Sequence, residues 1–400
     1  MMRLLLHSSA VSRALRPSLS RCIASTASCA SSSTSGSPSD GSLPPAHVPV
    51  LLQETVAAFS RNISEAWKPL HFVDGTAGFG GHSRALLQHF PDAKLLCVDR
   101  DPEVLGIAQA NLSDFHGRVS FQIGSYADLG SHLEAAGFPD EVDGVLVDLG
   151  ANSFHFDAAR RGFSVLNDGP LDMRFNQRDS EAPTAADAVN NLSEVQLTKI
   201  FREFGEERLA KEFAKAIVRE REERGKVFET TRDLRECIER IANMWGSSDR
   251  GKNKKKGKRA SKIGSTHPAT RCFQALRIYV NDELNHVESG VKQLANHLAP
   301  NGRLVTIAFH SLEDRPIKNF FRELDNQGRE SADDDEDEWE DEEDSDEDED
   351  ADEETPEDID PLSRKRFRLT RRKATKATDE EIAANSRSRS ARLRCLERIL

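Results

Sequence analysis

The sequence has few cysteines and no long apolar run. Six cysteines occur among 400 residues and none forms a Cys-x-x-Cys pair, so the sequence indicates neither a disulfide scaffold nor a structural zinc site. No stretch approaches the roughly 20 apolar residues that span a bilayer, and we expect no membrane partner. Because no group of His, Cys, Asp and Glu has the spacing of metal ligands, we also expect no metal ion.

The formal net charge of −13 comes from one segment. Asp333 to Asp360 holds 22 Asp and Glu and no Lys or Arg. Without this segment the remaining chain is net positive, by about nine charges. The overall charge therefore does not exclude a nucleic-acid partner, although it first suggests an acidic protein that would repel one.

Residues 1–45 predict an organelle-targeting segment. They contain four arginines, many serines and no acid before Asp40, a composition typical of transit peptides. A secretory signal fits less well, because its apolar core would have to include Arg13 and Arg16. We favour import into the mitochondrial matrix over the chloroplast; a disordered tail is the alternative.

Short apolar segments alternate with helical segments over residues 46–175. The predicted strands are Leu70–Asp74, Lys94–Asp99, Val119–Ile123 and Val142–Asp148. His82–Phe90 and Pro102–Leu112 predict the helices between them. This alternation is typical of a parallel sheet covered by helices, so the predicted fold class is α/β.

Residues 176–266 predict an inserted all-α domain. The predicted helices are Ala185–Asn190, Ser193–Phe204, Glu207–Arg224 and Thr231–Trp245. A helix over Arg271–His297 and a buried strand over Gly302–Phe309 then resume the α/β pattern, so residues 267–325 predict the second part of the first domain.

Three charge blocks predict solvated, disordered chain. Arg250 to Lys262 holds eight Lys or Arg in 13 residues, the acidic block forms an insertion over 326–362, and residues 361–376 are basic again. Lys and Arg bind phosphates by displacing counterions, so 250–262 and 364–398 are candidate RNA-binding segments. A solvated or import-related charge run is the alternative for both basic segments, and we favour an inert role for the acidic one.

A strand, a glycine-rich turn and a helix follow one another from His71 to His82. Asp74 ends the strand, and Gly78 and Gly80 follow with the spacing Asp-x-x-x-Gly-x-Gly. Glycines permit positive φ and close approach of a ligand, and this arrangement forms the nucleotide-cofactor end of a doubly wound sheet. The spacing matches neither the dinucleotide fingerprint Gly-x-Gly-x-x-Gly nor a P-loop.

Two more acids end predicted strands. Asp99 lies 25 residues after Asp74, and Asp148 ends a later strand. A carboxylate at the position of Asp99 can accept hydrogen bonds from both ribose hydroxyls of NAD or of S-adenosylmethionine, and the glycine spacing disfavours NAD. We expect all three acids to line one crevice at the carboxyl edge of the sheet. For each acid alone, a helix cap or a turn is the alternative.

Longer motifs follow one another in a recognisable order. They are His47–Val56, His71–His82, Asp148–Asp157, Arg161–Phe175, Gly205–Lys211, His267–Arg277, Leu298–Leu304, Phe309–Arg315 and Asn385–Arg394. This order resembles the RsmH/MraW family, the S-adenosylmethionine-dependent methyltransferases that methylate N4 of a cytidine in the decoding region of small-subunit ribosomal RNA. The resemblance covers about 47–325 and 371–398, and with residues 1–45 the chain looks like an organellar member.

The resemblance implies a Rossmann-like class I methyltransferase sheet with an inserted all-α domain, completed by residues 363–400. It also implies S-adenosylmethionine as the cofactor. The implied cofactor-binding residues are Asp74, Gly78, Gly80, Gly81, His82, Asp99, Tyr126, Asp148 and His155. Among them, Gly80 to His82 would hold the methionine end, Asp99 the ribose and Tyr126 the adenine.

Asp148 and Asn152 are the candidate catalytic residues. A cytosine amine is a poor nucleophile because its lone pair is delocalised into the ring, and a nearby acceptor can rehybridise it and later take its proton. The chain departs from the family at 151–152 and 154–156, where His155 replaces a usual Gln, and Ser386 replaces a usual Pro. A ribosome-assembly factor with weak catalysis is therefore the alternative function.

The implied partner is small-subunit ribosomal RNA or the assembling small subunit. The candidate substrate residues are Arg174, Arg271, Arg277, His310 and Asp314. Each has a structural alternative, namely pairing with an opposite charge inside the protein. A DNA amino-methyltransferase is disfavoured, because no Pro-Pro follows the strand that ends at Asp148.

Overall fold

The computed structural model describes residues 49–60, 69–252, 267–330, 362 and 365–399. The predicted transit peptide, the acidic block over 333–360 and most of the basic block over 250–262 lie outside the described residues. No helix of the described ranges is long and apolar enough to cross a membrane.

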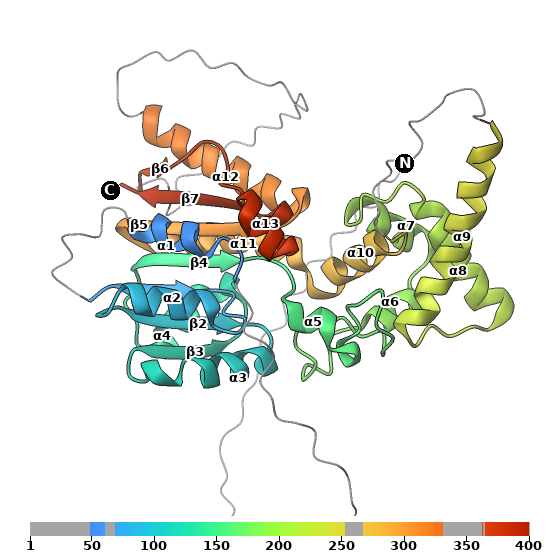
Figure 1. The fold of residues 1–400 in the computed structure, drawn as a ribbon, viewed down its shortest axis with the longest axis horizontal. Helices are drawn as coiled ribbons and strands as arrows, with labels where there is room; N and C mark the ends of the chain where they lie inside the picture. The colour runs from blue at the N-terminus through green and yellow to red at the C-terminus, as the bar shows by residue number, and fades with distance from the viewer. Residues whose placement is uncertain (1–48, 61–68, 253–266, 331–361, 363–364, 400) are drawn as a thin grey trace, which may run out of the picture. The chain divides into compact units, whose positions relative to one another are not determined.

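A seven-stranded sheet of order β3-β2-β1-β4-β5-β7-β6 organises residues 46–400 (Figure 1). The parallel strands are β1 (His71–Asp74), β2 (Lys94–Asp99), β3 (Val119–Ile123), β4 (Val142–Asp148) and β5 (Leu298–Ala308). Strand β7 (Arg392–Arg398) runs antiparallel to β5, and β6 (Phe367–Leu369) runs antiparallel to β7. The α/β prediction is confirmed, and the strand order reverses between β1 and β4, where such sheets bind ligands.

Alternate side chains of the strands enter two apolar layers. Phe72, Leu95 and Leu146 pack on one face, with α1 (Leu52–Ser60), α2 (Gly81–His89) and α3 (Pro102–Asn111). The following residues, Val73 and Leu96, pack on the other face. That face is covered by α4 (Leu129–Ala136), α11 (Glu283–Asn296) and α12 (Ser311–Glu330). Burial on both faces explains why these strands read as continuous apolar runs.

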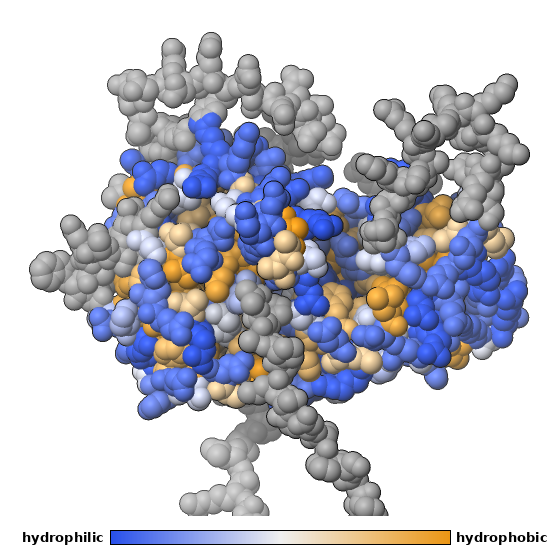
Figure 2. All heavy atoms as spheres, in the orientation of Figure 1, coloured by the Kyte–Doolittle hydropathy of each residue, from blue (hydrophilic) through white to orange (hydrophobic). Residues whose placement is uncertain are grey.

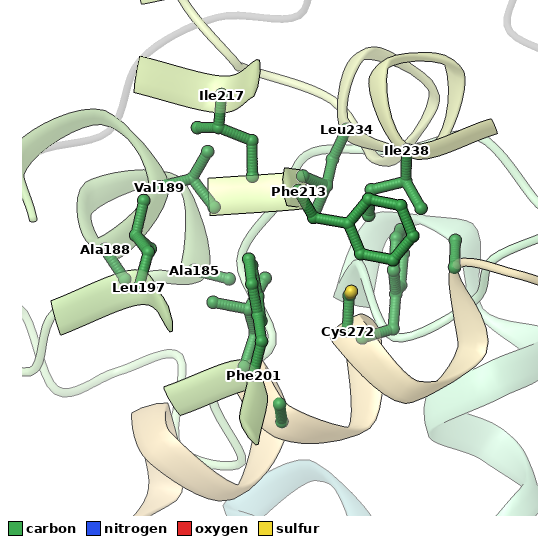
Figure 3. Close-up of a cluster of buried hydrophobic side chains, with 14 of the residues drawn as sticks. Ala185, Ala188, Val189, Leu197, Phe201, Phe213, Ile217, Leu234, Ile238 and Cys272 are labelled. Carbon is green, nitrogen blue, oxygen red and sulfur yellow. The ribbon is translucent and has the colours of Figure 1, made fainter. Parts of the chain in front are cut away.

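The predicted helical insertion is present. It contains α6 (Ala185–Asn191), α7 (Glu194–Glu203), α8 (Ala210–Arg224) and α9 (Thr231–Lys252). Thr184 and Ser193 each form a reciprocal capping box that begins a helix. Apolar side chains of these helices, among them Phe201 and Phe213, meet in a separate core (Figure 3), while hydrophilic residues predominate on the side of the helical insertion that Figure 2 shows.

The single helix predicted over 271–297 is wrong. The chain forms α10 (Thr270–Asn281) and α11, and it breaks at Asp282, whose φ is 51°. Buried residues of α10, such as Cys272, pack into the core of the helical insertion. The helical core therefore reaches beyond the expected boundary at 266, because α10 contributes its apolar face to α7 rather than to the sheet.

The disorder predicted for residues 361–376 is wrong over the part that the structure describes. Phe367 is 1% exposed, and its strand β6 pairs with β7. Thr375 forms a further bridge to Leu393. Several basic side chains, such as Arg371 and Lys373, remain exposed, while the backbone and Phe367 are held by a strand that lies about 30 residues later in the chain. A charge count does not register this pairing.

Candidate active site

A cleft of about 880 Å³ opens at the carboxyl ends of β1, β2 and β4. Asp99, Asp148 and the glycine-rich turn line it from the sheet. The opposite wall comes from α10 and α11, and the short helix η5 (Ser386–Ser390) lies at one side. The crevice predicted at this edge is thus present, with Asp74 buried directly beneath its lining.

Asp74 supports the glycine-rich turn from below. Its Oδ2 accepts a hydrogen bond of 2.6 Å from Ser83 Oγ, and its Oδ1 accepts one of 3.3 Å from the Thr76 amide. Burial raises the pKa of this carboxyl to about 6. Because its oxygens are engaged by the turn and by α2, Asp74 positions the turn rather than reaching into the cleft.

Asp99 joins the turn to the second strand. Its two oxygens accept hydrogen bonds of 2.9 Å from the backbone amides of Gly78 and Asp101, and burial raises its pKa to about 7. Gly78 has φ of 55°, a conformation that glycine adopts without steric cost. The carboxylate faces the cleft with acceptor capacity left for hydroxyl donors, since each oxygen has two lone pairs.

Gly81 and His82 begin α2 and line the cleft, whereas Gly80, which caps the helix, does not line it. Gly80 has φ of 79°, and a Cβ on Gly81 would lie 2.4 Å from Pro49 Cγ. His82 Nε2 is 3.0 Å from the Val50 carbonyl, while its Nδ1 is 3.8 Å from Asp148 Oδ2. The turn therefore needs its glycines, and His82 links the Pro49–Val50 segment to the acid that ends β4.

Tyr126 is held rigidly at the wall between sheet and α11. It is 6% exposed. A Cβ on Gly290 would come within 2.4 Å of its ring, and one on Gly75 within 2.9 Å of its Cβ. Two glycines thus make room for this ring, which gives the cleft a fixed aromatic surface.

Asp148 lines the cleft and carries one unsatisfied acceptor. Its amide donates a 2.6 Å hydrogen bond to Thr76 Oγ1, whereas Oδ1 is buried without a hydrogen-bond partner in the described part of the chain. Burial, followed by repulsion from Asp74 and Glu313, raises the pKa of this carboxyl well above its usual range. Because buried polar atoms normally have partners, we expect this carboxyl to bind a hydrogen-bond donor or a cation.

These features fit S-adenosylmethionine. A fixed aromatic ring, a ribose-type carboxylate, glycines that admit a ligand to the backbone and an orphaned acceptor lie along one cleft. Among the residues that the structure describes, no group of three or more His, Cys, Asp or Glu could hold a metal ion.

Asn152 and His155 cap α5 (Ser153–Asp157) reciprocally. Asn152 Oδ1 accepts from the His155 amide at 3.3 Å, and the Asn152 amide donates to His155 Nδ1 at 3.2 Å. Nε2 of His155 lies 2.9 Å from Asp101 Oδ2. Both residues line the cleft, but each ring nitrogen of His155 is already bonded inside the protein. The sequence suggested that this ring binds the cofactor, but neither of its nitrogens is available for a hydrogen bond to one.

Arg174 and Asp314 lie outside the lining of the cleft. Arg174 forms a paired contact with Asp172, at 3.0 and 2.9 Å. Asp314 is 3% exposed and accepts from Arg392 at 2.8 Å and Arg394 at 2.7 Å. Both candidates therefore pair with opposite charges inside the protein, which is the structural alternative to a contact with the substrate.

His310 and Arg277 line the cleft, whereas Arg271 does not. Arg277 forms two hydrogen bonds, of 2.9 and 3.0 Å, with Glu283, and Arg271 donates to the Glu206 carbonyl at 3.1 Å. His310 and Arg277 are therefore the substrate candidates that lie in the cleft, and their contact with the substrate stays a prediction.

Sequence reasoning missed Glu313. It is 1% exposed, accepts a 2.8 Å hydrogen bond from the Phe309 amide, and lies 2.9 Å from His310 Nε2. The motif Phe309–Arg315 contains both acids, and the neighbouring Asp314 is the one expected from the sequence to contact the substrate. Only the orientation of α12 separates the two acids, because adjacent helical residues point about 100° apart.

Comparisons with known proteins show the family of the chain. A model of the MraW methylase family matches residues 45–332. The ribosomal RNA small subunit methyltransferase H of Nitratidesulfovibrio vulgaris is 37% identical over 355 residues, covering 88% of this chain and 86% of that protein. Proteins of the same description from Shewanella sediminis and Maricaulis maris are 36% and 38% identical, covering 88% and 87% of this chain and 98% and 90% of theirs. The chain therefore belongs to the MraW methylase family.

Proposed function

We propose that this methyltransferase transfers a methyl group from S-adenosylmethionine to N4 of a cytidine in the decoding region of mitochondrial small-subunit ribosomal RNA, and so supports ribosome assembly. The observation that carries the proposal is that Asp148, a carboxyl with one unsatisfied oxygen, lines a cleft whose wall also contains Asp99 and Tyr126. The relatives are described as ribosomal RNA small subunit methyltransferases, which supports the substrate class.

The chain's own residues position the reaction. Asp99 would accept the ribose hydroxyls, the backbone at Gly78 to Gly81 would face the methionine end, and the Tyr126 ring would lie beside the adenine. When bound, the cofactor supplies an electrophilic methyl group on a sulfonium. Methyl transfer is an in-line displacement in which the protein contributes chiefly orientation.

Asp148 is the proposed proton acceptor. Its carboxylate, which lines the cleft, would accept a hydrogen bond from the cytosine amine, which localises the nitrogen lone pair, and it would then take the proton that the amine loses on methylation. Asn152 would hold the turn after Asp148 through its cap on α5. Asn152 would therefore affect catalysis only indirectly, by holding this turn in place.

The test is transfer of labelled methyl from S-adenosylmethionine to small subunits that lack the modification, followed by mapping of N4-methylcytidine. We expect one modified cytidine with the wild type, and a loss of about 100-fold or more in rate with Asp148→Asn. The affinity for S-adenosylhomocysteine is the control for folding. Full methylation by Asp148→Asn would refute the role of this carboxylate.

The same assay separates the enzyme from an assembly factor. A protein that binds the subunit and S-adenosylhomocysteine without methylating any nucleotide would be the catalytically weak factor that the departures at 151–156 allow. Mitochondrial targeting rests on residues 1–45, and a fluorescent fusion of these residues should enter mitochondria. Entry into chloroplasts instead would contradict the proposed compartment.

A further inference from the structure

The arginines and lysines near the C-terminus divide into two groups by their partners. Residues 365–399 contain twelve Lys and Arg but four acids. Some of the cations are bound to acids inside the fold: Arg392 and Arg394 contact Asp314, and Arg398 contacts Glu141. These arginines hold β7 to α12 and to the segment that precedes β4.

The second group is exposed at the surface. Its members are Arg371, Lys373, Lys376, Arg387 and Arg389. Arg387 lies 3.9 Å from Asp157, which is itself 72% exposed. At that distance and exposure an ion pair holds the side chain only weakly, so Arg387 can exchange this contact for a phosphate.

Both parts of this second group are fixed beside the cleft. Arg387 and Arg389 lie on η5, where Ser386, Arg387 and Ser390 line the cleft. Ser388 of the same helix is fully buried and bonds to the Asn385 carbonyl at 2.7 Å. The backbone of η5 is therefore anchored while its arginines face outward.

The loop over residues 371–376 is tied to the same place. Thr375 and Leu393 exchange backbone hydrogen bonds of 2.9 Å at the start of β7, next to η5 in the chain. The helix between them, α13 (Asp379–Ala384), is held to the cleft rim because Glu381 accepts a 2.7 Å bond from the Leu51 amide. Figure 1 draws α13 and the beginning of β7 together at the ends of β4 and β5.

We propose that the surface formed by Arg371, Lys373, Lys376, Arg387 and Arg389 binds the RNA backbone on either side of the target nucleotide. We call it the C-terminal phosphate surface. The proposal rests on the proposed function, since it names the contacts by which that substrate is held. Exposed cations at the rim of a cleft suit a single strand that delivers one base inward, because phosphates need no sequence-specific readout.

The acids of α13 limit the surface on one side. Asp379 and Glu380 are exposed in its first turn, whereas Glu381 accepts a hydrogen bond from the Leu51 amide. RNA should therefore pass over η5 and the loop over 371–376 and avoid the N-terminal end of α13. This predicts that replacing Asp379 with Asn strengthens RNA binding rather than weakening it.

The test measures binding of a fluorescein-labelled single-stranded RNA of 20 nucleotides to the full chain between 50 and 300 mM KCl. Arg387→Gln/Arg389→Gln removes two cations from η5, and Lys373→Gln/Lys376→Gln removes two from the loop. The salt slope is the slope of the logarithm of the affinity against the logarithm of the salt concentration. For single strands, each lost phosphate contact should reduce its magnitude by about 0.7. The slope of each double variant should therefore be smaller by about 1.4, and each should bind RNA roughly tenfold more weakly at 100 mM.

Lys94→Gln/Lys292→Gln is the matched control. It removes two exposed cations, one of them at the amino end of β2 on the opposite edge of the sheet from the cleft. Its slope should equal that of the wild type. Equal slopes for the control and both test variants would overturn the proposal, as would equal losses in all three.

Methyl transfer, measured separately, distinguishes this proposal from the proposed function. If the wild type binds RNA with the predicted slopes but methylates no cytidine, the proposed function fails and the phosphate surface stands. If it methylates normally while both test variants keep the wild-type slope, the surface fails and the function stands.

Discussion

Arg161 is expected to be a main support of the region between the sheet and the helical insertion. Its side chain is 1% exposed, and Nη1 lies 2.6 Å from Asp101 Oδ2. Nη2 donates to the carbonyls of Arg174 and Phe175, at 3.0 and 2.8 Å. Asp101 is equally buried and also accepts from His155.

Removing Arg161 leaves the Asp101 charge buried and underpaired. Burial opposes ionisation of Asp101, but the hydrogen bond from His155 and the charge of Arg161 together hold its pKa below the usual value. Breaking a buried ion pair from one side costs about 3–5 kcal/mol. Arg161→Met keeps the apolar stem of the side chain and should lower the free energy of unfolding by about 3–5 kcal/mol. That is a large part of the roughly 5–15 kcal/mol by which a typical domain is stable.

The neighbouring Arg160 supplies the control. Its side chain is 54% exposed and pairs with Glu103, which is 41% exposed, so Arg160→Met should cost about 0–1 kcal/mol. Urea unfolding of the full chain, followed by circular dichroism, measures both. Asp101→Asn in the Arg161→Met background should restore part of the loss, because Asn removes the charge and still caps α3.

The reasoning would be refuted if Arg161→Met and Arg160→Met unfolded at the same urea concentration. It would also fail if adding Asp101→Asn to Arg161→Met destabilised the chain further by the full cost of an independent substitution. Additivity of that kind is expected for residues that do not interact.

Two more predictions concern the cofactor end of the cleft. Asp99 has its pKa raised to about 7, so its contribution to stability is complete below about pH 4 and is lost as the pH rises to about 7. Asp99→Asn should flatten this decline of the melting temperature and abolish binding of S-adenosylhomocysteine by calorimetry, and an unchanged decline would contradict this sign. Gly290→Ala should displace the Tyr126 ring, which a Cβ would approach to 2.4 Å, and should weaken S-adenosylhomocysteine binding about tenfold or more, whereas Gly106→Ala, where a Cβ meets no atom within 4 Å, should bind it normally.

Local sequence pattern was sufficient for much of the sheet. The predicted strands Lys94–Asp99, Val119–Ile123 and Val142–Asp148 match β2, β3 and β4 residue for residue. Strands β2 and β4 are buried, short, apolar and bounded by turn residues, whereas β3 is a partly exposed edge strand in which apolar and polar residues alternate. These properties are local. The convergence of Asp74, Asp99 and Asp148 followed from them, since parallel strands end at one edge.

The C-terminal strands needed the tertiary structure. Nothing local predicts that Phe367–Leu369 joins the sheet, because its partner β7 begins more than 20 residues later and its surroundings are strongly charged. The break at Asp282 was missed for a similar reason. Its φ of 51° lets α10 pack on α7 while α11 packs on the sheet side, and a helical pattern that continues through the break hides this change of direction.

The sequence by itself determined the family through the order of its motifs. It also determined the α/β class and the three acids at the edge of the sheet, because periodicity and spacing record which residues share a face. The tertiary structure decided how single side chains are used. Asp314 is neutralised by Arg394, 80 residues away, while the adjacent Glu313 faces the cleft. Likewise, some C-terminal arginines are bound to acids and others remain exposed beside the cleft. Such roles depend on partners that are distant in sequence and meet only when the chain folds.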